Sequence, residues 1–396
     1  MSRGPFGLEV HPYYDSKTIL DEIKLAEAMG YDDVWIGDSQ LIWRELYVLM
    51  GAAAQTTSKV FLGSGVTNPI TRLPAVTASA AVTLQELSGG RMMLGIGSGF
   101  SSVNTMGMKP ATLKNLEQFV SDVKALCRGE TIRRKKTEMN LAFGAPEKCP
   151  PIYIAASGPK MLELAGRVGD GVILARASIK SNMLTDMLDC VNAGRKFREK
   201  EVPDFKTFLS LPVCVDTDKR KAMEAVRPHV ARSILTPLWE LSKLAAETLK
   251  NLEQQYNNYE HLHPTANHAD IIPDEVVPEY AIAGTPADCK DEVVRLLEGN
   301  IDQIVHSLND LSQTLREMHG ILLRMPERCN PETYYHRIRP YMFGWKNNPE
   351  LPEGMIYEGV EAYDGKPQHF RGETGAQSSV IYAFDGFLGI EHDYDE

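Results

Sequence analysis

Two acidic residues follow short apolar segments near the start of the sequence, where they could donate or accept protons. Residues 6–11 alternate as Phe-Gly-Leu-Glu-Val-His, which predicts a strand whose Glu9 points away from the apolar side chains. Residues 34–37 predict a second strand, and Asp38 follows it directly. Enzymes built on parallel strands keep acid–base groups and substrate anchors at the carboxyl ends of those strands. The alternatives are a satisfied core carboxylate for Glu9 and a helix cap for Asp38.

Glycine gathers at the ends of two further expected strands. Residues 60–62 lead into Gly63-Ser64-Gly65-Val66-Thr67, and residues 92–96 lead into Gly97-Ser98-Gly99. Glycine lets the backbone approach a ring closely and leaves amide donors uncovered. The pattern therefore predicts a flat, rigid ligand across these strand ends. The alternative is a crowded strand end that needs small residues for packing alone.

A third group of residues could bind phosphate. Small residues and a proline separate an expected strand, 152–156, from an expected helix, 161–168: Ser157, Gly158, Pro159 and Lys160. A helix that begins in this way exposes free amides and the positive end of its dipole, which suits an anion. The next expected strand, 171–175, ends at Arg176, which could pair with the same phosphate. Taken alone, Arg176 could equally be a surface charge.

Three histidines lie close together in a long insertion, residues 218–283. They are His261, His263 and His268. Their spacing could suggest a metal site, but no adjacent carboxylates support one. We therefore expect a polar loop there and no metal.

The composition narrows the class of protein. The 396 residues carry a net charge of −11, which argues against nucleic acid or an anionic membrane as the main partner. Six cysteines are scattered without a CxxC pair, which fits reduced thiols in a cytoplasm. No apolar run approaches about 18 residues and no secretory leader is present, so a soluble, cytoplasmic protein is expected.

The elements that must position these residues alternate between strand and helix, which predicts a parallel α/β architecture. The fifth, sixth and seventh strands are expected at 152–156, 171–175 and 208–215. Residues 129–150, with a basic run at 133–136, are expected to form a solvated hairpin. The only candidate for an eighth strand is 300–305, but a helical period that begins near Ile301 could replace it.

A long, ordered run carries a family resemblance: GVTNPITRLPAVTASAAVTLQELSGGRMMLGIG, residues 65–97. It closely resembles the bacterial luciferase-like flavin oxidoreductases, and within them the branch with methylenetetrahydromethanopterin reductase and other deazaflavin-dependent enzymes. The resemblance covers roughly residues 5–300. It implies a (β/α)8 TIM-type barrel, incomplete if the eighth strand is lost.

The same resemblance implies a cofactor and its contacts. The cofactor would be FMN or the deazaflavin coenzyme, with a non-proline cis peptide bond near Gly65–Val66 against the back face of the ring. The implied cofactor-binding residues are Gly65, Val66, Thr67, Gly97, Gly99, Ser157, Gly158, Lys160 and Arg176. The catalytic candidates remain Glu9 and Asp38.

Two chemistries stay open under this resemblance. FMN could activate oxygen for monooxygenation with paired donors, which needs a reductase that supplies reduced cofactor. The deazaflavin favours hydride transfer. The methanopterin reductases have the pattern GIGPGD, but this chain has Phe100 at its last position. Losing that carboxylate weakens the case for a pterin substrate and favours an apolar or aromatic small molecule.

The final part of the sequence resembles a second family. The segments CNPETYYHRIRPYMFGWKNNPELPEGMIYEGV and FRGETGAQSSVIYAFDGFLGIEH are similar to indoleamine 2,3-dioxygenase, over roughly residues 303–392. That family is a helical haem enzyme. By motif position, Arg339 would bind a substrate carboxylate, Thr374 would lie above the haem, and Tyr334 and Tyr335 would replace two phenylalanines.

This second resemblance lacks the segment with the proximal histidine, and neither His369 nor His392 fits that position. Haem iron needs an axial ligand, so haem is not expected. We therefore expect a luciferase-like barrel at 1–300 and a helical fragment at 301–396. The alternatives to a flavin or deazaflavin oxidoreductase are a haem-dependent indole dioxygenase and an inactive fusion remnant. Luciferase-like proteins often form homodimers, which the composition neither supports nor opposes.

Overall fold

The computed structural model describes residues 6–198, 200–299 and 301–307. The chain divides into two units, and the described residues belong almost entirely to the first, Met1–Glu27 with Tyr31–Asn309. The residues expected from the dioxygenase resemblance lie outside the described part of the chain: Tyr334, Tyr335, Arg339, His369, Thr374 and His392.

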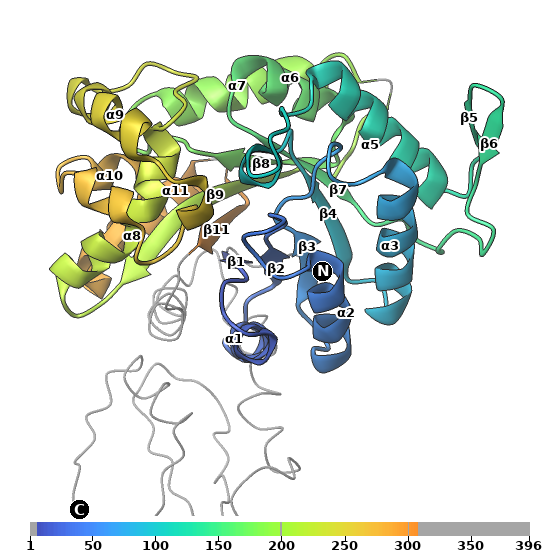
Figure 1. The fold of residues 1–396 in the computed structure, drawn as a ribbon, viewed down its shortest axis with the longest axis horizontal. Coiled ribbons are helices and arrows are strands. Elements are labelled where there is room, and N and C mark those ends of the chain that lie inside the picture. Colours follow the sequence, from blue (N-terminus) through green and yellow to red (C-terminus); the bar gives the residue numbers. More distant parts are fainter. Residues whose placement is uncertain (1–5, 199, 300, 308–396) are drawn as a thin grey trace, which may run out of the picture. The chain divides into compact units, whose positions relative to one another are not determined.

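Eight parallel strands close into a barrel, which confirms the expected TIM-type architecture (Figure 1). They are β1 (Phe6–Val10), β2 (Asp33–Ile36), β3 (Phe61–Ser64), β4 (Met92–Ile96), β7 (Ile152–Ala156), β8 (Gly171–Ala175), β9 (Lys206–Val215) and β11 (Gln303–Ser307). The ring follows chain order and closes where β11 pairs with both β9 and β1. A short further strand, β10 (Ile282–Gly284), pairs with the end of β9.

The eighth strand forms, so the expectation that a helix could replace it is wrong. Ile304 pairs with Phe6 on one side and with Leu209 on the other. Strand β11 is buried on both faces, with Ile304 fully buried and Val305 only 2% exposed. A strand buried on both faces shows no clean alternation, which explains why its pattern merged with the apolar residues that follow it.

Helices surround the barrel (Figure 1). They are α1 (Ser16–Ala28), α2 (Leu46–Thr56), α3 (Pro74–Leu87), α4 (Ser101–Asn104), α5 (Leu113–Cys127), α6 (Pro159–Val168), α7 (Met183–Arg195), α8 (Lys219–Ile234), α9 (Lys243–Gln255), α10 (Val277–Tyr280) and α11 (Pro286–Glu298). Side-chain caps begin several of them, such as Asp218 before α8 and a reciprocal capping box between Thr285 and Asp288 at α11. Helices α8 to α11 gather on one side of the barrel, at the left in Figure 1.

The polar insertion between α5 and β7 forms the expected hairpin. Strands β5 (Ile132–Arg134) and β6 (Thr137–Met139) pair antiparallel, with Lys135 in a left-handed conformation at the turn. The hairpin projects from the barrel at the right of Figure 1. Its exposed Arg133 pairs with the exposed Glu138, so the basic run is at least partly balanced within the hairpin itself.

Large side chains from six strands fill the barrel interior. They are Trp35, Met93, Tyr153, Ile173, Phe208 and Val305. Trp35 needs glycine beside it, since a Cβ on Gly63 would lie 2.4 Å from the indole ring. This packed layer occupies the inside of the barrel, so a ligand must bind at the strand ends.

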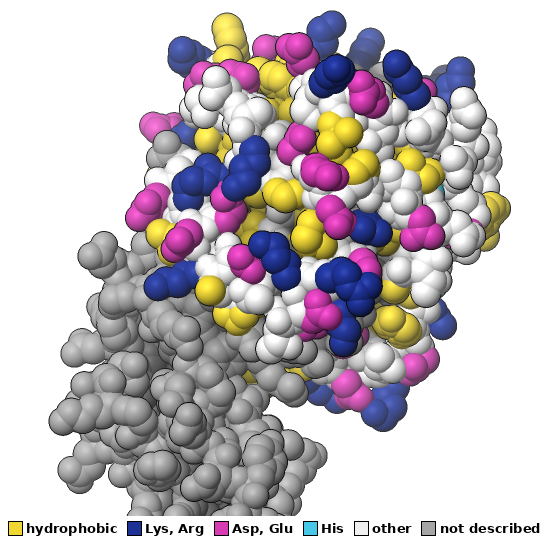
Figure 2. Space-filling model, turned by 90° about the vertical axis from the view of Figure 1, so that its left-hand side faces the viewer, with side chains coloured by type: hydrophobic (Ala, Val, Ile, Leu, Met, Phe, Trp, Pro, Cys, Tyr) yellow, Lys and Arg dark blue, Asp and Glu magenta, His cyan; other side chains and the backbone are white. Residues whose placement is uncertain are grey.

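The face that carries α8 to α11 shows acidic and basic side chains interspersed with scattered hydrophobic groups (Figure 2). No charge of a single sign dominates the described residues on this face. Within the described residues, none of the helices combines the length and the hydrophobicity that a membrane span requires.

Candidate active site

A cavity of about 920 Å³ opens at the carboxyl ends of the barrel strands. The structure brings most of the predicted site residues together, and they line this one cavity. They are Glu9, Asp38, Gly65, Val66, Gly99, Ser157, Gly158, Lys160 and Arg176. Thr67 and Gly97 are not among the lining residues.

Glu9 lies at the end of β1 with its carboxylate partly open to the cavity. The Ser210 hydroxyl donates to Glu9 Oε2 at 2.9 Å, and the Nε2 atom of His11 lies 3.4 Å from Oε1. Its side chain is 18% exposed and borders the cavity, so Glu9 is accessible to a bound molecule although it also has partners within the protein. A mostly buried carboxylate that borders the cavity and has one close donor, Ser210, and one more distant neighbour, His11, can exchange a proton with a bound molecule.

Asp38 is almost fully buried at the end of β2, and its two oxygens are surrounded by donors. Thr67 Oγ1 donates to Oδ2 at 2.9 Å and Gln40 Nε2 donates to Oδ1 at 2.6 Å. Arg72 donates to both oxygens, at 3.1 Å from Nε and 2.8 Å from Nη2. A carboxylate with four donors has little capacity left for proton transfer. This geometry favours a structural role at the rim of the cavity.

The glycine-rich ends of β3 and β4 form one wall of the cavity. The Gly65–Val66 peptide bond is cis, as the family resemblance implied. A Cβ on Gly97 would lie 2.9 Å from Val66 Cγ2, so Gly97 leaves room for the Val66 side chain. The Gly97 amide donates to the carbonyl of Thr67 at 2.9 Å. Thr67 and Gly97 therefore support the wall from behind, and Gly65, Val66 and Gly99 form its surface.

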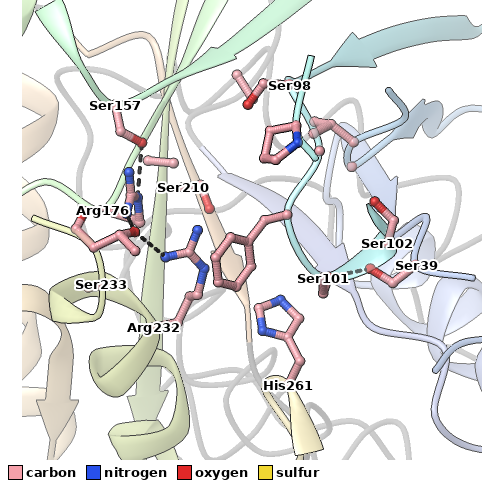
Figure 3. Close-up of a pocket in the computed structure, with 18 of the residues that line it drawn as sticks. Ser39, Ser98, Ser101, Ser102, Ser157, Arg176, Ser210, Arg232, Ser233 and His261 are labelled. Atoms are coloured by element: carbon pink, nitrogen blue, oxygen red, sulfur yellow. Dashed lines mark hydrogen bonds between the residues drawn. The ribbon is translucent and has the colours of Figure 1, made fainter. Parts of the chain in front are cut away.

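The opposite end of the cavity is positively charged (Figure 3). Helix α6 begins there, at Pro159 directly after Gly158, with the Lys160 side chain beside the opening. Arg176 has a left-handed backbone, φ 61°, and its Nε donates to Ser157 Oγ at 3.2 Å. Its Nη1 also donates to the Thr236 carbonyl at 2.9 Å. Arg176 is thus held inside the cavity and is not a free surface charge.

A second arginine, which the sequence did not suggest, stands beside Arg176. Arg232 comes from α8, and its Nη1 donates to Thr236 Oγ1 at 3.3 Å. Arg176 donates to the same hydroxyl at 2.7 Å. Burial, together with the charge of Arg232, lowers the pKa of Arg176 to about 9, and burial lowers the pKa of Arg232 to about 10. Both guanidinium groups remain charged at neutral pH.

Histidines and aromatic rings form the remaining wall. His261 is buried, and its ring centroid lies 5.7 Å from that of Phe100 and 5.8 Å from that of Trp43. The hydroxyl of Tyr256 lies 2.6 Å from His261 Nδ1. Burial, and then the charge of Arg232, keep the pKa of His261 well below its usual range, so this ring is neutral at pH 7.

The expectation of a plain polar loop is therefore wrong for His261, and also for His268, which is buried against the Tyr256 ring at 4.3 Å. His263 is partly exposed. The described residues contain no cluster of histidine, cysteine and carboxylate groups that could hold a metal ion. The insertion folds back over the strand ends, which its polar sequence did not reveal.

A further histidine on α8 also lines the cavity. His229 precedes Arg232 by one helical turn, and its ring centroid lies 5.3 Å from that of His11. Burial and the neighbouring His11 keep its pKa well below the usual range. His229 and Arg232 are three positions apart in α8, which places them on one helix face. This spacing was the only sequence signal that could have marked the two residues as part of the site.

Comparison with known proteins matches the chain to one family over most of its length. The family model described as luciferase-like monooxygenase matches residues 5–303. The model described as indoleamine 2,3-dioxygenase matches residues 284–396. The described part of that second match comprises the last residue of β10, helix α11 and all of β11, and β11 is the eighth strand of the barrel.

Individual relatives extend the comparison. The 5,10-methylenetetrahydromethanopterin reductase of Archaeoglobus fulgidus is 32% identical over 313 residues, which cover 76% of this chain and 92% of the relative. An F420-dependent glucose-6-phosphate dehydrogenase of Amycolatopsis mediterranei is 28% identical over 299 residues, 71% of this chain and 85% of the relative. The solved F420-dependent tetrahydromethanopterin reductase of Methanopyrus kandleri shares the fold, with a TM-score of 0.68, 23% identity, and coverage of 80% and 97%.

Proposed function

Because the chain belongs to the luciferase-like monooxygenase family, we propose that it is an oxidoreductase that binds a flavin or deazaflavin ring in this cavity. One observation carries the proposal. The cavity has a wall with few side chains, formed by Gly65, Val66 and Gly99, and its other end is lined by Ser157 and Arg176. A flat ring with a phosphate-bearing side chain matches both the wall and the charged end.

We propose F420 as the cofactor and hydride transfer as the reaction. The relatives reported above are named as F420-dependent enzymes or as methylenetetrahydromethanopterin reductases. When bound, the deazaflavin ring would supply the hydride-accepting or hydride-donating carbon. The chain would place that ring against Val66, and Ser157, Lys160 and Arg176 would hold its phosphate.

The protein must also move a proton when a hydride leaves or enters a carbon that bears oxygen or nitrogen. Glu9 is the best candidate for this step, because its carboxylate borders the cavity and, among the described residues, has Ser210 and His11 as its close side-chain partners. Asp38 is fully occupied by Arg72, Thr67 and Gln40, so we assign it to positioning.

The substrate-side wall favours a small organic molecule with an apolar or aromatic part. The His261 ring lies there between two aromatic partners, Phe100 and Trp43, with each centroid less than 6 Å from its own. The carboxylate that ends the GIGPGD pattern is absent, since Phe100 occupies its position. We therefore do not extend a pterin substrate to this chain.

FMN-dependent monooxygenation is the second candidate, because two adjacent guanidinium groups would suit the doubly charged phosphate of FMN. This reaction would require a reductase as partner. The reductase, a homodimeric assembly and a cytoplasmic location stay predictions. A haem-dependent reaction is not proposed, because the described residues of the dioxygenase match are parts of the barrel.

Equilibrium titration of the full chain with F420 and with FMN tests the proposal. We expect saturable binding of one or both ligands. Binding is measured by the quenching of the ligand's fluorescence. The substitution Gly97→Ala should weaken ring binding about tenfold, because its Cβ would press on Val66. Gly51→Ala is the matched control, since a Cβ there meets nothing within 4 Å. If neither ring binds, the proposed function is wrong.

Binding would then be followed by a reaction screen with small alcohols, aldehydes and aromatic compounds, in which reduction of F420 is read from the loss of its visible absorbance. Turnover with F420 alone supports hydride transfer. Turnover that requires oxygen and reduced FMN supports the second candidate.

A further inference from the structure

Two guanidinium groups converge on one hydroxyl inside the cavity. Arg176 Nη1 and Arg232 Nη1 lie 2.7 Å and 3.3 Å from Thr236 Oγ1, and Figure 3 shows both side chains directed to the same place. Two like charges held this close repel each other unless an anion lies between or beside them. Such a pair needs a reason to persist.

Neither arginine has an ion-pair partner among the described residues. The carboxylate of Glu9 lines the same cavity but is engaged by Ser210 and His11. The neighbours that line the cavity beside Arg232 are neutral: Phe100, His229, Ser233, Thr236 and His261. The positive charge of this end is therefore not balanced by the protein in the described part of the chain.

The donors of the two groups are unequally used. Arg176 donates to Ser157 and twice to Thr236, which occupies most of its edge. Arg232 donates once, at 3.3 Å, and a guanidinium carries five N–H donors. Most of the donor capacity that faces the cavity therefore belongs to Arg232.

The contact with Phe100 leaves the N–H donors of Arg232 available for a ligand. The Arg232 guanidinium lies over the Phe100 ring, with 3.7 Å from Cζ to the ring centroid. In the GIGPGD pattern an aspartate stands at this position, and a carboxylate there would reach Arg232 and neutralise it. The aromatic ring instead supports the guanidinium from one side by cation–π attraction. Apart from the contact to Thr236, it leaves the N–H groups of Arg232 without a partner among the described residues.

We propose that Arg232, with Arg176 across Thr236, binds a phosphate monoester group of a ligand. Two fixed cations match the two negative charges of a monoester, and their planar forks suit its three terminal oxygens. The group could belong to a phosphorylated substrate or to the phosphate of FMN. Assigning it to one of these rests on the proposed function, whereas the anion site itself does not.

Equilibrium dialysis of the full chain with radiolabelled inorganic phosphate tests the site. We expect saturable binding of one phosphate to the unmodified protein. Arg232→Met should weaken it at least tenfold, because a charge-assisted contact is lost. Phe100→Asp should weaken it to a similar degree, because the new carboxylate would pair with Arg232.

Two further variants serve as controls. Phe100→Tyr keeps an aromatic ring over Arg232 and adds no carboxylate, so it should retain phosphate affinity within about threefold. Arg220→Met removes an exposed arginine on the same helix, one that pairs with Glu224, and should have no effect. The inference is overturned if the unmodified protein binds no phosphate, or if Arg232→Met binds it equally well.

The same measurement, repeated with a bound ring, separates the two sources. If FMN blocks phosphate binding and riboflavin does not, the monoester is that of the flavin. If phosphate still binds to the ring-saturated protein, the monoester belongs to the substrate. If the protein binds FMN or F420 but not phosphate, the anion site proposed here is wrong and the proposed function stands. If it binds phosphate but neither ring, the proposed function is wrong and the anion site stands.

Discussion

The Ser210 hydroxyl donates to Glu9 Oε2 at 2.9 Å across the mouth of the barrel, although 201 positions separate the two residues in the chain. Strand β11 lies between their strands, so this contact exists only because the eighth strand closes the ring. The hydrogen bond orients a carboxylate that would otherwise turn freely in the cavity.

Glu9→Gln should lower kcat in the F420-reduction assay about 100-fold or more, because the amide keeps the shape of the carboxylate but cannot accept a proton. The dissociation constant of the ring should change less than threefold. Ser210→Ala is the control, which should cost about tenfold or less because the carboxylate remains. Equal loss in ring binding and in kcat for Glu9→Gln would contradict a role in proton transfer.

Asp38→Asn should lower the free energy of unfolding by about 2 kcal/mol, because it leaves the largely buried Arg72 without its buried counter-charge. Urea denaturation measures this change. The matched control is Glu45→Gln, which removes the more exposed partner of the same arginine and should cost less than about 1 kcal/mol. Losses of the same size in both variants would argue against the structural role of Asp38.

Arg176→Gly should weaken the binding of FMN at least tenfold and leave the binding of riboflavin within about twofold, because only FMN has a phosphate. The left-handed backbone at this position, φ 61°, suits glycine, so we expect the free energy of unfolding to change by less than about 1 kcal/mol. Arg167→Ala, which removes an exposed arginine that pairs with Glu117, is the control. A loss that is equal for both ligands would place the phosphate elsewhere.

The stability of the barrel should fall as the pH falls below about 6.5, where unfolded histidine takes up a proton. Burial lowers the pKa of His306 to about 3 in the folded state, so the folded protein binds fewer protons across this interval and stability decreases towards pH 3. Between pH 7.5 and pH 5, this residue should cost about 2 kcal/mol, at roughly 1.4 kcal/mol per pH unit below 6.5.

Urea denaturation at the two pH values checks this expectation. His306→Gln also removes the contact to the Tyr31 hydroxyl and should be less stable at both values, but its stability should differ less between them. His263→Gln, at a partly exposed position, should keep the difference seen in the unmodified protein. An unchanged difference in His306→Gln would show that another group carries the pH dependence.

The sequence by itself determined the barrel and much of its mouth. Glu9 lies near the carboxyl end of a short apolar strand, and Gly65, Ser157 and Arg176 each follow one. Parallel strands in a barrel end on the same side, so strand order alone was enough to bring these residues together. The local pattern also determined the hairpin at 129–150, because no apolar periodicity tied it to the core.

Tertiary structure decided what each of these residues does. Asp38 and Glu9 have equivalent positions in the sequence pattern, but Arg72 reaches one of them and leaves the other open to the cavity. Strand β11 exists because β1 and β9 supply its partners, which a local helical period cannot indicate.

Arg232 and His261 belong to a helix and to an insertion, and only their packing over the strand ends makes them part of the cavity. Strand ends are local features that a chain carries in its own pattern. The pairing, burial and charge balance of a side chain depend on residues tens to hundreds of positions away, so these properties arise only when the barrel closes.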